Sequence, residues 1–445
     1  MQKSKMGLVL AWALVMPLAC NDFSGGSSGD ADHRDESPTY ESLMQNVLLG
    51  ADYWDEEPRI LAAGLGFTNI NGVPGINRPA PLGEEAAREA GGTWNTLDCG
   101  DRIPSTGDYT SAATPAQVAV GFGVPTFYSD GLPIEMSWPV LAGTLDVDDI
   151  QVTLSDGSVV EPEAVSIFPN YEYNERSTIV IFGQFGNRVD PTTHPEEAVY
   201  PIFFEIVDDD TPLLLAGPNG QVLSAVGLTY GQPGDQLTAY KTGNGPTLVA
   251  AKLSVMSSLG ESAPSAFQGN LPNDGISLYM DRAEYRLRIL TTGGFSPDGV
   301  LGVLPTEFSR YFRLRAETGD GGEVWIESTG EHTIDGYRLE VVGLADLGLP
   351  AGNGIEYDDC YAEDHDNQID IVLAGDEEAM RMITHVEIPA TGDYDPLYNP
   401  GGPGNAPTPG VRYSMPSPRT FQEVTMAIDD PMTVSYGELD QPIRR

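Results

Sequence analysis

Short runs in which apolar and polar residues alternate restrict the fold of this chain more than any other feature. Between 150 and 154, Ile, Val and Leu occupy every second position, and Ser155-Asp156-Gly157-Ser158 then separates this run from Val159-Val160. A period of two is typical of a strand with one buried face, and an Asp-Gly pair between two such runs predicts a hairpin. The 51 glycines and 35 prolines keep the runs short.

Further runs of this kind predict strands along most of the chain. They cover 134–138, 177–183, 200–207, 285–290, 311–315, 323–326 and 337–342. Short strands at this spacing predict an all-β fold with two packed β-sandwich-like domains, Gly/Pro-rich loops and a few short helices. The predicted helices are 42–49, 84–90 and 376–383, the last with Asp376 as its N-cap.

Changes in composition divide the chain into six predicted segments. They are a signal peptide (1–20), a flexible tether (21–37), an irregular region with short helices that wraps a neighbouring domain (38–115), a first β-sandwich (116–235), a second β-domain with the acidic loop and arginine strands (236–435), and a tail (436–445).

The first 20 residues have the layout of a bacterial secretion signal. Lys3 and Lys5 precede an apolar run at 7–18, and small residues lead to Cys20. The run is shorter than the roughly 20 apolar residues that a stable membrane-spanning helix needs. We therefore expect an exported chain that does not span the membrane.

Leu18-Ala19-Cys20 resembles the lipobox of bacterial lipoproteins, although Pro17 stands where that family usually has a branched apolar residue. The resemblance implies that Cys20 is acylated and holds the protein at the outer membrane or cell surface by the lipid alone. The alternative is an ordinary signal peptide cut near Ala19. The Gly/Ser/Asp tract that follows is typical of a flexible tether.

The segments "PIEMSWPV", "STIVIF" and "YPIFFEIVDDD" look like bacterial immunoglobulin-like modules of surface-layer and adhesion proteins. The resemblance covers about residues 130–210. It implies a β-sandwich that serves as a spacer or docking unit.

The net charge of -43 disfavours nucleic acid and bare anionic membranes as partners. Divalent cations and basic ligands stay compatible with it. Because 40% of the residues are hydrophobic, the chain can bury substantial cores and is not a disordered acidic tail.

The chain contains three cysteines, and lipidation of Cys20 would leave only Cys99 and Cys360. Two remaining thiols in an oxidising compartment usually pair. We therefore predict a Cys99–Cys360 disulfide that fastens the N-terminal region to the C-terminal one. The alternative is two buried thiols.

An acidic loop supplies the one cofactor prediction. Asp364, Asp366, Gln368 and Asp370 alternate, so an extended backbone would project their oxygens to one side, as Ca²⁺ requires. The loop is no EF-hand, because Ile369 replaces the turn glycine. One interpretation is a structural Ca²⁺ site, and the other is a solvated acidic loop.

Two Arg-x-Arg pairs, Arg286/Arg288 and Arg313/Arg315, lie on predicted strands. Like charges on one strand face repel, so these arginines need carboxylate partners, for which the 356–370 loop is one source. Alternatively, they bind an anionic ligand such as an acidic sugar.

An aromatic group could form either a sandwich core or a sugar-stacking platform. Its members are Trp138, Phe168, Tyr171, Tyr173, Phe182 and Phe185.

The chain contains no nucleophile elbow, zinc-binding helix or phosphate-binding loop motif. We therefore expect a structural or ligand-binding surface protein, with calcium as a candidate requirement and a polysaccharide or another surface protein as ligand. The alternative is an exported carbohydrate-active hydrolase or lyase, because glycoside cleavage needs only two suitably spaced carboxylates. The sequence does not specify the ligand or the oligomeric state.

Overall fold

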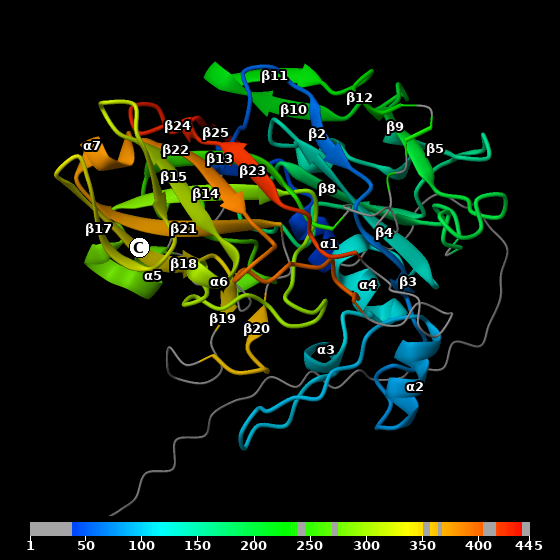
Figure 1. Cartoon of the computed structure of the whole chain (residues 1–445). Coiled ribbons are helices and arrows are strands. Elements are labelled where there is room, and N and C mark those ends of the chain that lie inside the picture. Colours follow the sequence, from blue (N-terminus) through cyan, green and yellow to red (C-terminus); the bar gives the residue numbers. More distant parts are fainter. Residues whose placement is uncertain are drawn as a thin grey trace, which may run out of the picture. The chain divides into compact units, whose positions relative to one another are not determined.

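The computed structural model describes residues 38–187, 189–232, 234–235, 237, 245–268, 275–349, 357–363, 367–403 and 415–437. These residues fold mainly into antiparallel strands, which form several sheets joined by loops and a few short helices (Figure 1). The predicted all-β fold class is therefore confirmed.

The first sandwich encloses one apolar core between a five-stranded and a four-stranded sheet. The five-stranded β4 sheet contains β2 (Ile60–Ala63), β4 (Ser129–Met136), β8 (Thr178–Gly183) and β7 (Ala164–Ser166), with β3 (Phe67–Asn71) also paired to β4. The opposite sheet runs β12 (Thr229–Gly231), β9 (Pro201–Ile206), β5 (Ile150–Leu154) and β6 (Val159–Val160). Ile134, Val152 and Phe204 are buried in this core.

Alternation along β4 divides its side chains between two environments. Ile134 and Met136 belong to the core of the first sandwich. Since neighbouring side chains on a strand point to opposite faces, Pro133 and Glu135 lie on the other face of the sheet. Glu135 is nevertheless fully buried, so that face must be covered by other parts of the protein.

The second sandwich is built in the same way. Its six-stranded β14 sheet contains β17 (Gly330–Ile334), β18 (Tyr337–Ala345), β21 (Gln368–Gly375), β14 (Tyr285–Thr291), β13 (Leu248–Val255) and β24 (Thr425–Met426). Its four-stranded β15 sheet contains β16 (Glu323–Ile326), β15 (Arg313–Glu317), β22 (Ile383–Ile388) and β23 (Thr420–Glu423). Leu287, Leu314 and Val386 are buried between these two sheets.

The other described elements are short. Three two-stranded sheets pair β1 (Leu48–Asp52) with β25 (Thr433–Tyr436), β10 (Leu214–Gly217) with β11 (Gln221–Ser224), and β19 (Gly348–Leu349) with β20 (Ala362–Glu363). The helices are α1 (Pro38–Leu43), α2 (Leu82–Glu89), α3 (Thr106–Tyr109), α4 (Pro115–Phe122), α5 (Gly275–Tyr279), α6 (Phe308–Tyr311) and α7 (Glu377–Met380). Single 3₁₀ turns occupy Ala142–Thr144, Val147–Asp149, Pro218–Gly220 and Met280–Arg282.

The N-terminal region is more regular than the sequence predicted. Strands β2 and β3 lie within 38–115 and complete the β4 sheet, so the first sandwich begins before residue 116. The helix predicted at 42–49 is wrong beyond its first two residues, because α1 ends at Leu43 and Leu48 and Leu49 start a strand that pairs with β25. Pairing with a distant strand overrides the local helical preference of these residues.

The helix predicted at 376–383 is also shorter in the structure. Helix α7 ends at Met380, and Ile383 already pairs within the β15 sheet. The Asp376 side chain does not cap the helix, because its Oδ2 accepts a hydrogen bond from the Arg338 backbone N–H at 2.7 Å.

Several predictions fall on residues outside the described ranges. They concern the signal peptide, Cys20, the tether, Asp364, Asp366 and the last eight residues of the tail. Within the described ranges, no helix combines the length and the apolar character that crossing a membrane requires.

Candidate functional site

A cavity of about 420 Å³ lies against the outer face of the β4 sheet. Pro133 of β4 and Thr178, Val180 and Phe182 of β8 form this wall. We call the cavity the α4 pocket, because α4 forms much of the opposite side. Asn367, which directly precedes β21, and Asn399, which follows β22, also line it, so both sandwiches contribute to one site.

Local sequence explains why α4 forms at this position. Thr114 caps the helix by accepting from the Gln117 backbone N–H at 3.1 Å, and the Gln117 side chain accepts in return from the Thr114 N–H. Pro115 occupies the first turn, and Gly123 ends the helix with φ of 76°. The helix therefore has a fixed start and end.

Helix α4 presents an apolar face to the pocket. Val118 and Phe122 are buried against Val180 and Phe182. The rings of Phe122 and Phe182 are stacked, with their centroids 3.9 Å apart. This packing holds the helix on the sheet while leaving the cavity beside it.

Glycine at position 131 gives the aromatic wall its room. A Cβ at Gly131 would lie 2.5 Å from the Phe67 ring and 2.9 Å from the Phe182 ring. Any larger residue would displace these side chains, which both line the pocket.

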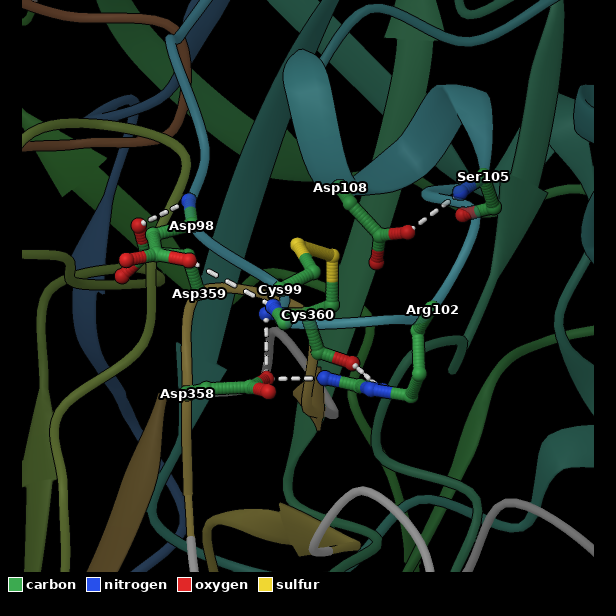
Figure 2. The surroundings of a disulfide bond; sticks show 9 residues. Asp98, Cys99, Arg102, Ser105, Asp108, Asp358, Asp359 and Cys360 are labelled. Carbon is green, nitrogen blue, oxygen red and sulfur yellow. Dashed lines mark hydrogen bonds and ion pairs between the residues drawn. A yellow bond between two sulfur atoms is a disulfide. The ribbon is translucent and has the colours of Figure 1, made fainter.

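The predicted disulfide between Cys99 and Cys360 is present, with the two Cα atoms 5.5 Å apart. Figure 2 shows it between the 98–105 segment and the 358–360 segment. Arg102 donates to the Cys360 carbonyl at 2.6 Å and pairs with Asp358. The bridge and these bonds fasten the segment that leads into the pocket wall.

Further hydrogen bonds hold this segment on the second sandwich. Thr93 Oγ1 donates to the Gly401 carbonyl at 2.8 Å, and Asn95 Nδ2 donates to Asp298 Oδ2 at 2.8 Å. Ser111, which lines the pocket, donates to the Gly299 carbonyl. One wall of the pocket is thus held on the second sandwich while the other is a sheet of the first.

Polar side chains gather at one part of the pocket surface. Asn170 Nδ2 donates to Asn367 Oδ1 at 2.9 Å, and Thr178 Oγ1 lies 3.2 Å from the same oxygen. Thr178 Oγ1 also lies 2.6 Å from Glu135 Oε2, beneath the lining residues. Burial raises the pKa of Glu135 to about 8, although the hydrogen bonds from Thr178 and Asn367 act in the opposite direction.

None of the described residues that line the α4 pocket carries a charge. They are apolar, aromatic or neutral polar residues, in a chain with 66 acidic and 23 basic residues. The site is therefore suited to an uncharged surface of a ligand and offers no described pair of carboxylates.

The arginines singled out in the sequence lie elsewhere, on two different sheets. Arg286 and Arg288 belong to β14 and point away from the second sandwich's core, whereas Arg313 and Arg315 belong to β15. The structure therefore does not combine the two pairs into one patch.

Arg288 lies at the centre of a buried ionic cluster. Its guanidinium is within 2.7 Å of Glu175, 2.8 Å of Asp346 and 2.8 Å of Asp370. The cluster comprises the cations Lys252, Arg286 and Arg288 and the carboxylates Asp52, Glu175, Glu261, Asp346 and Asp370. The expectation that these strand arginines find carboxylate partners, Asp370 of the acidic loop among them, is confirmed.

Arg313 and Arg315 face outward from the β15 sheet. Arg313 pairs with Glu387 at 2.7 Å, and its guanidinium lies 4.0 Å from the centre of the Trp325 ring. Arg315 pairs with Glu323 at 3.3 Å and contacts His385. These arginines also have acidic partners, but they stay partly exposed.

Two of the four residues predicted to bind Ca²⁺ are described, and both are buried in β21. Asp370 is engaged by Arg288, and Gln368 lies two residues before it on the same strand. No cluster of acidic, histidine or cysteine side chains in the described segments has the arrangement of a metal site. The Ca²⁺ site stays a prediction, because Asp364 and Asp366 lie outside these segments.

Members of the aromatic group lie in the core or at the α4 pocket, and the sugar-stacking role stays a prediction. Trp138, Tyr171 and Phe185 belong to the first sandwich's core. Phe168 and Phe182 line the α4 pocket. Sequence reasoning did not find the polar part of this pocket, since Thr178 and Asn367 are 189 residues apart and neither belongs to a recognisable motif.

Comparisons with protein-family models, with curated proteins and with solved structures found no match to this chain.

Proposed function

We propose that this chain is an exported, lipid-anchored binding protein that holds a small, largely apolar molecule in the α4 pocket. The observation that carries the proposal is a cavity of about 420 Å³ with aromatic walls and no charged residue among its described lining. Cavities of roughly 300–1,000 Å³ are typical small-molecule sites, and a dry cavity of about 150 Å³ holds benzene. The α4 pocket has nearly three times that volume.

Binding is better supported than carbohydrate cleavage. Glycoside hydrolysis uses two carboxyl groups on either side of the scissile bond. The described lining of the pocket provides Phe168 and Phe182 as aromatic surfaces but no carboxylate. A hydrolase would need a second site that combines a cleft with paired acids.

Export and lipid attachment rest on the leader, the lipobox resemblance at Cys20 and the compartment in which disulfides persist. The Cys99–Cys360 bridge is consistent with such a compartment. The immunoglobulin-like resemblance and the Ca²⁺ requirement are separate predictions. Calorimetric titration of the metal-stripped protein with Ca²⁺ tests the latter.

Binding of N-phenyl-1-naphthylamine, an uncharged probe that fluoresces in apolar surroundings, tests the proposed site. We expect saturable binding to the purified protein. Ala113→Phe should weaken it at least about tenfold, because Ala113 lines the pocket and the new ring would occupy it.

Ala116→Phe provides the matched control. Ala116 lies on α4, is exposed and does not line the pocket, so its substitution should change the affinity by less than about twofold. Saturable binding that both variants weaken equally, or no saturable binding to a folded wild-type protein, would contradict the proposed site.

A further inference from the structure

Four side chains at the pocket form a continuous hydrogen-bonded row, and none of them need carry a charge. Asn170, Asn367 and Thr178 line the cavity, and Glu135 lies beneath Thr178. All four are at least nine-tenths buried. Asn367 is held in place because its Nδ2 donates to the Thr291 carbonyl at 3.2 Å.

The positions of the protons in this row of side chains follow from counting hydrogen-bond donors and acceptors. Thr178 has one hydroxyl proton, yet its Oγ1 contacts Glu135 Oε2 at 2.6 Å and Asn367 Oδ1 at 3.2 Å. If Glu135 were ionised, both neighbours would be acceptors, and one contact would have no proton. If Glu135 carries a proton on Oε2, it donates to Thr178, which donates to Asn367.

The environment of Glu135 agrees with the neutral form. Within the described segments its carboxyl forms no ion pair, and its Oε1 has no hydrogen-bond partner. Its hydrogen bonds come from the neutral side chains of Thr178 and Asn367. Burial without a cation raises its pKa to about 8. The buried cations of the described segments are engaged elsewhere: Lys252, Arg286 and Arg288 pair with carboxylates, and Arg176 donates to backbone carbonyls.

We infer that Glu135 acts as a neutral acid that fixes the orientation of Thr178 and Asn367, and that this edge of the α4 pocket recognises an uncharged polar group, a primary amide or an alcohol, at one end of an apolar ligand. This inference rests on the proposed function. An amide or alcohol can both donate to and accept from these side chains. A carboxylate or ammonium group would be buried without a counter-charge, which is strongly unfavourable.

Competition between matched amphiphiles tests the recognised group. Decanamide, decanol, decanoate and decylamine are each used to displace N-phenyl-1-naphthylamine from the full protein near neutral pH. We expect the amide or the alcohol to compete at least about tenfold better than both charged compounds. Equal competition by all four would overturn the inference and leave the pocket proposal standing, whereas a probe that never binds would refute the pocket itself.

The role of Glu135 has its own readout in the pH dependence of binding. Ionisation of Glu135 turns the Thr178 proton away from Asn367 and places a charge beneath the pocket. The affinity of the wild-type protein for decanamide should therefore fall about tenfold between about pH 7 and pH 9.5. Glu135→Gln cannot ionise, so its affinity should vary less than about twofold over this range.

Glu163→Gln is the control for this profile, since Glu163 is exposed and bonds Ser129 outside the pocket lining. It should keep the wild-type pH dependence. Near-ultraviolet circular dichroism at each pH confirms that the proteins stay folded. A wild-type profile as flat as that of Glu135→Gln, with all proteins folded, would overturn the assigned role of Glu135.

Discussion

Two buried regions of this protein combine residues of both sandwiches and differ in charge. The cluster around Arg288 contains eight ionisable side chains, three cations and five carboxylates, whereas the described lining of the α4 pocket contains none. The regions are neighbours in the chain, because Asn367 belongs to the pocket and Asp370 to the cluster. Buried charges occur where partners surround them closely, and the space left for a ligand is neutral.

The difference reflects the cost of burying charge. A buried ion needs partners and hydrogen bonds on every side, and such a cluster fixes geometry more than it adds stability. Burial and the neighbouring Glu175 raise the pKa of Asp346 well above its ordinary value, whereas Arg288 acts in the opposite direction. A cavity cannot supply such partners, so a charged lining would be unfavourable whenever the cavity is empty of water and ligand.

The largest loss of stability is expected when the ionic cluster around Arg288 is disrupted. Arg288→Met removes the central cation, which pairs with five carboxylates at 2.7–3.7 Å, so we expect the free energy of unfolding to fall by about 3–5 kcal/mol. Arg313→Met is the matched control on the partly exposed face of the β15 sheet and should cost no more than about 1 kcal/mol. Urea unfolding near neutral pH measures both, and equal losses would remove the distinction between the two Arg-x-Arg pairs.

An intermediate loss of stability is expected when the disulfide that fastens the pocket wall is removed. Replacing Cys99 and Cys360 by serine removes a cross-link between residues 261 positions apart in the sequence. It should lower the free energy of unfolding by about 2–4 kcal/mol. Because the 93–111 segment leads into the pocket wall, the affinity for N-phenyl-1-naphthylamine should fall as well, while the Arg288 cluster keeps its contacts. Unchanged affinity in the double variant would show that the bridge does not support the pocket.

The smallest effect on the free energy of unfolding, counted over one pH unit, is expected from Glu135 beneath the pocket lining. The pKa of Glu135 is about 8 in the folded protein and about 4.3 in an unfolded chain, so between these values the folded state binds more protons. The free energy of unfolding should therefore fall as pH rises through this range, by up to about 1.4 kcal/mol per pH unit from this group. Urea unfolding of Glu135→Gln should show a shallower fall than the wild type, and identical slopes would mean that Glu135 is ionised in the folded protein.

Local sequence predicted the strands of this protein well and its sites poorly. The run 150–154 and its Asp-Gly turn became β5 and a hairpin to β6, because alternation is read within a single segment. The helix predicted at 42–49 ended early, because its second half is decided by pairing with a strand almost 400 residues away in the chain, a distance that local propensity cannot register.

The sequence by itself determined which residues can form strands, and export chemistry predicted the pairing of Cys99 with Cys360. Tertiary structure alone decided that one Arg-x-Arg pair is buried among carboxylates while the other faces outward, although the two patterns are alike in sequence. It also decided that Thr178 and Asn367 meet at a cavity. The physical reason is that alternation assigns a side chain to a face of its strand, whereas what covers that face depends on how distant segments pack.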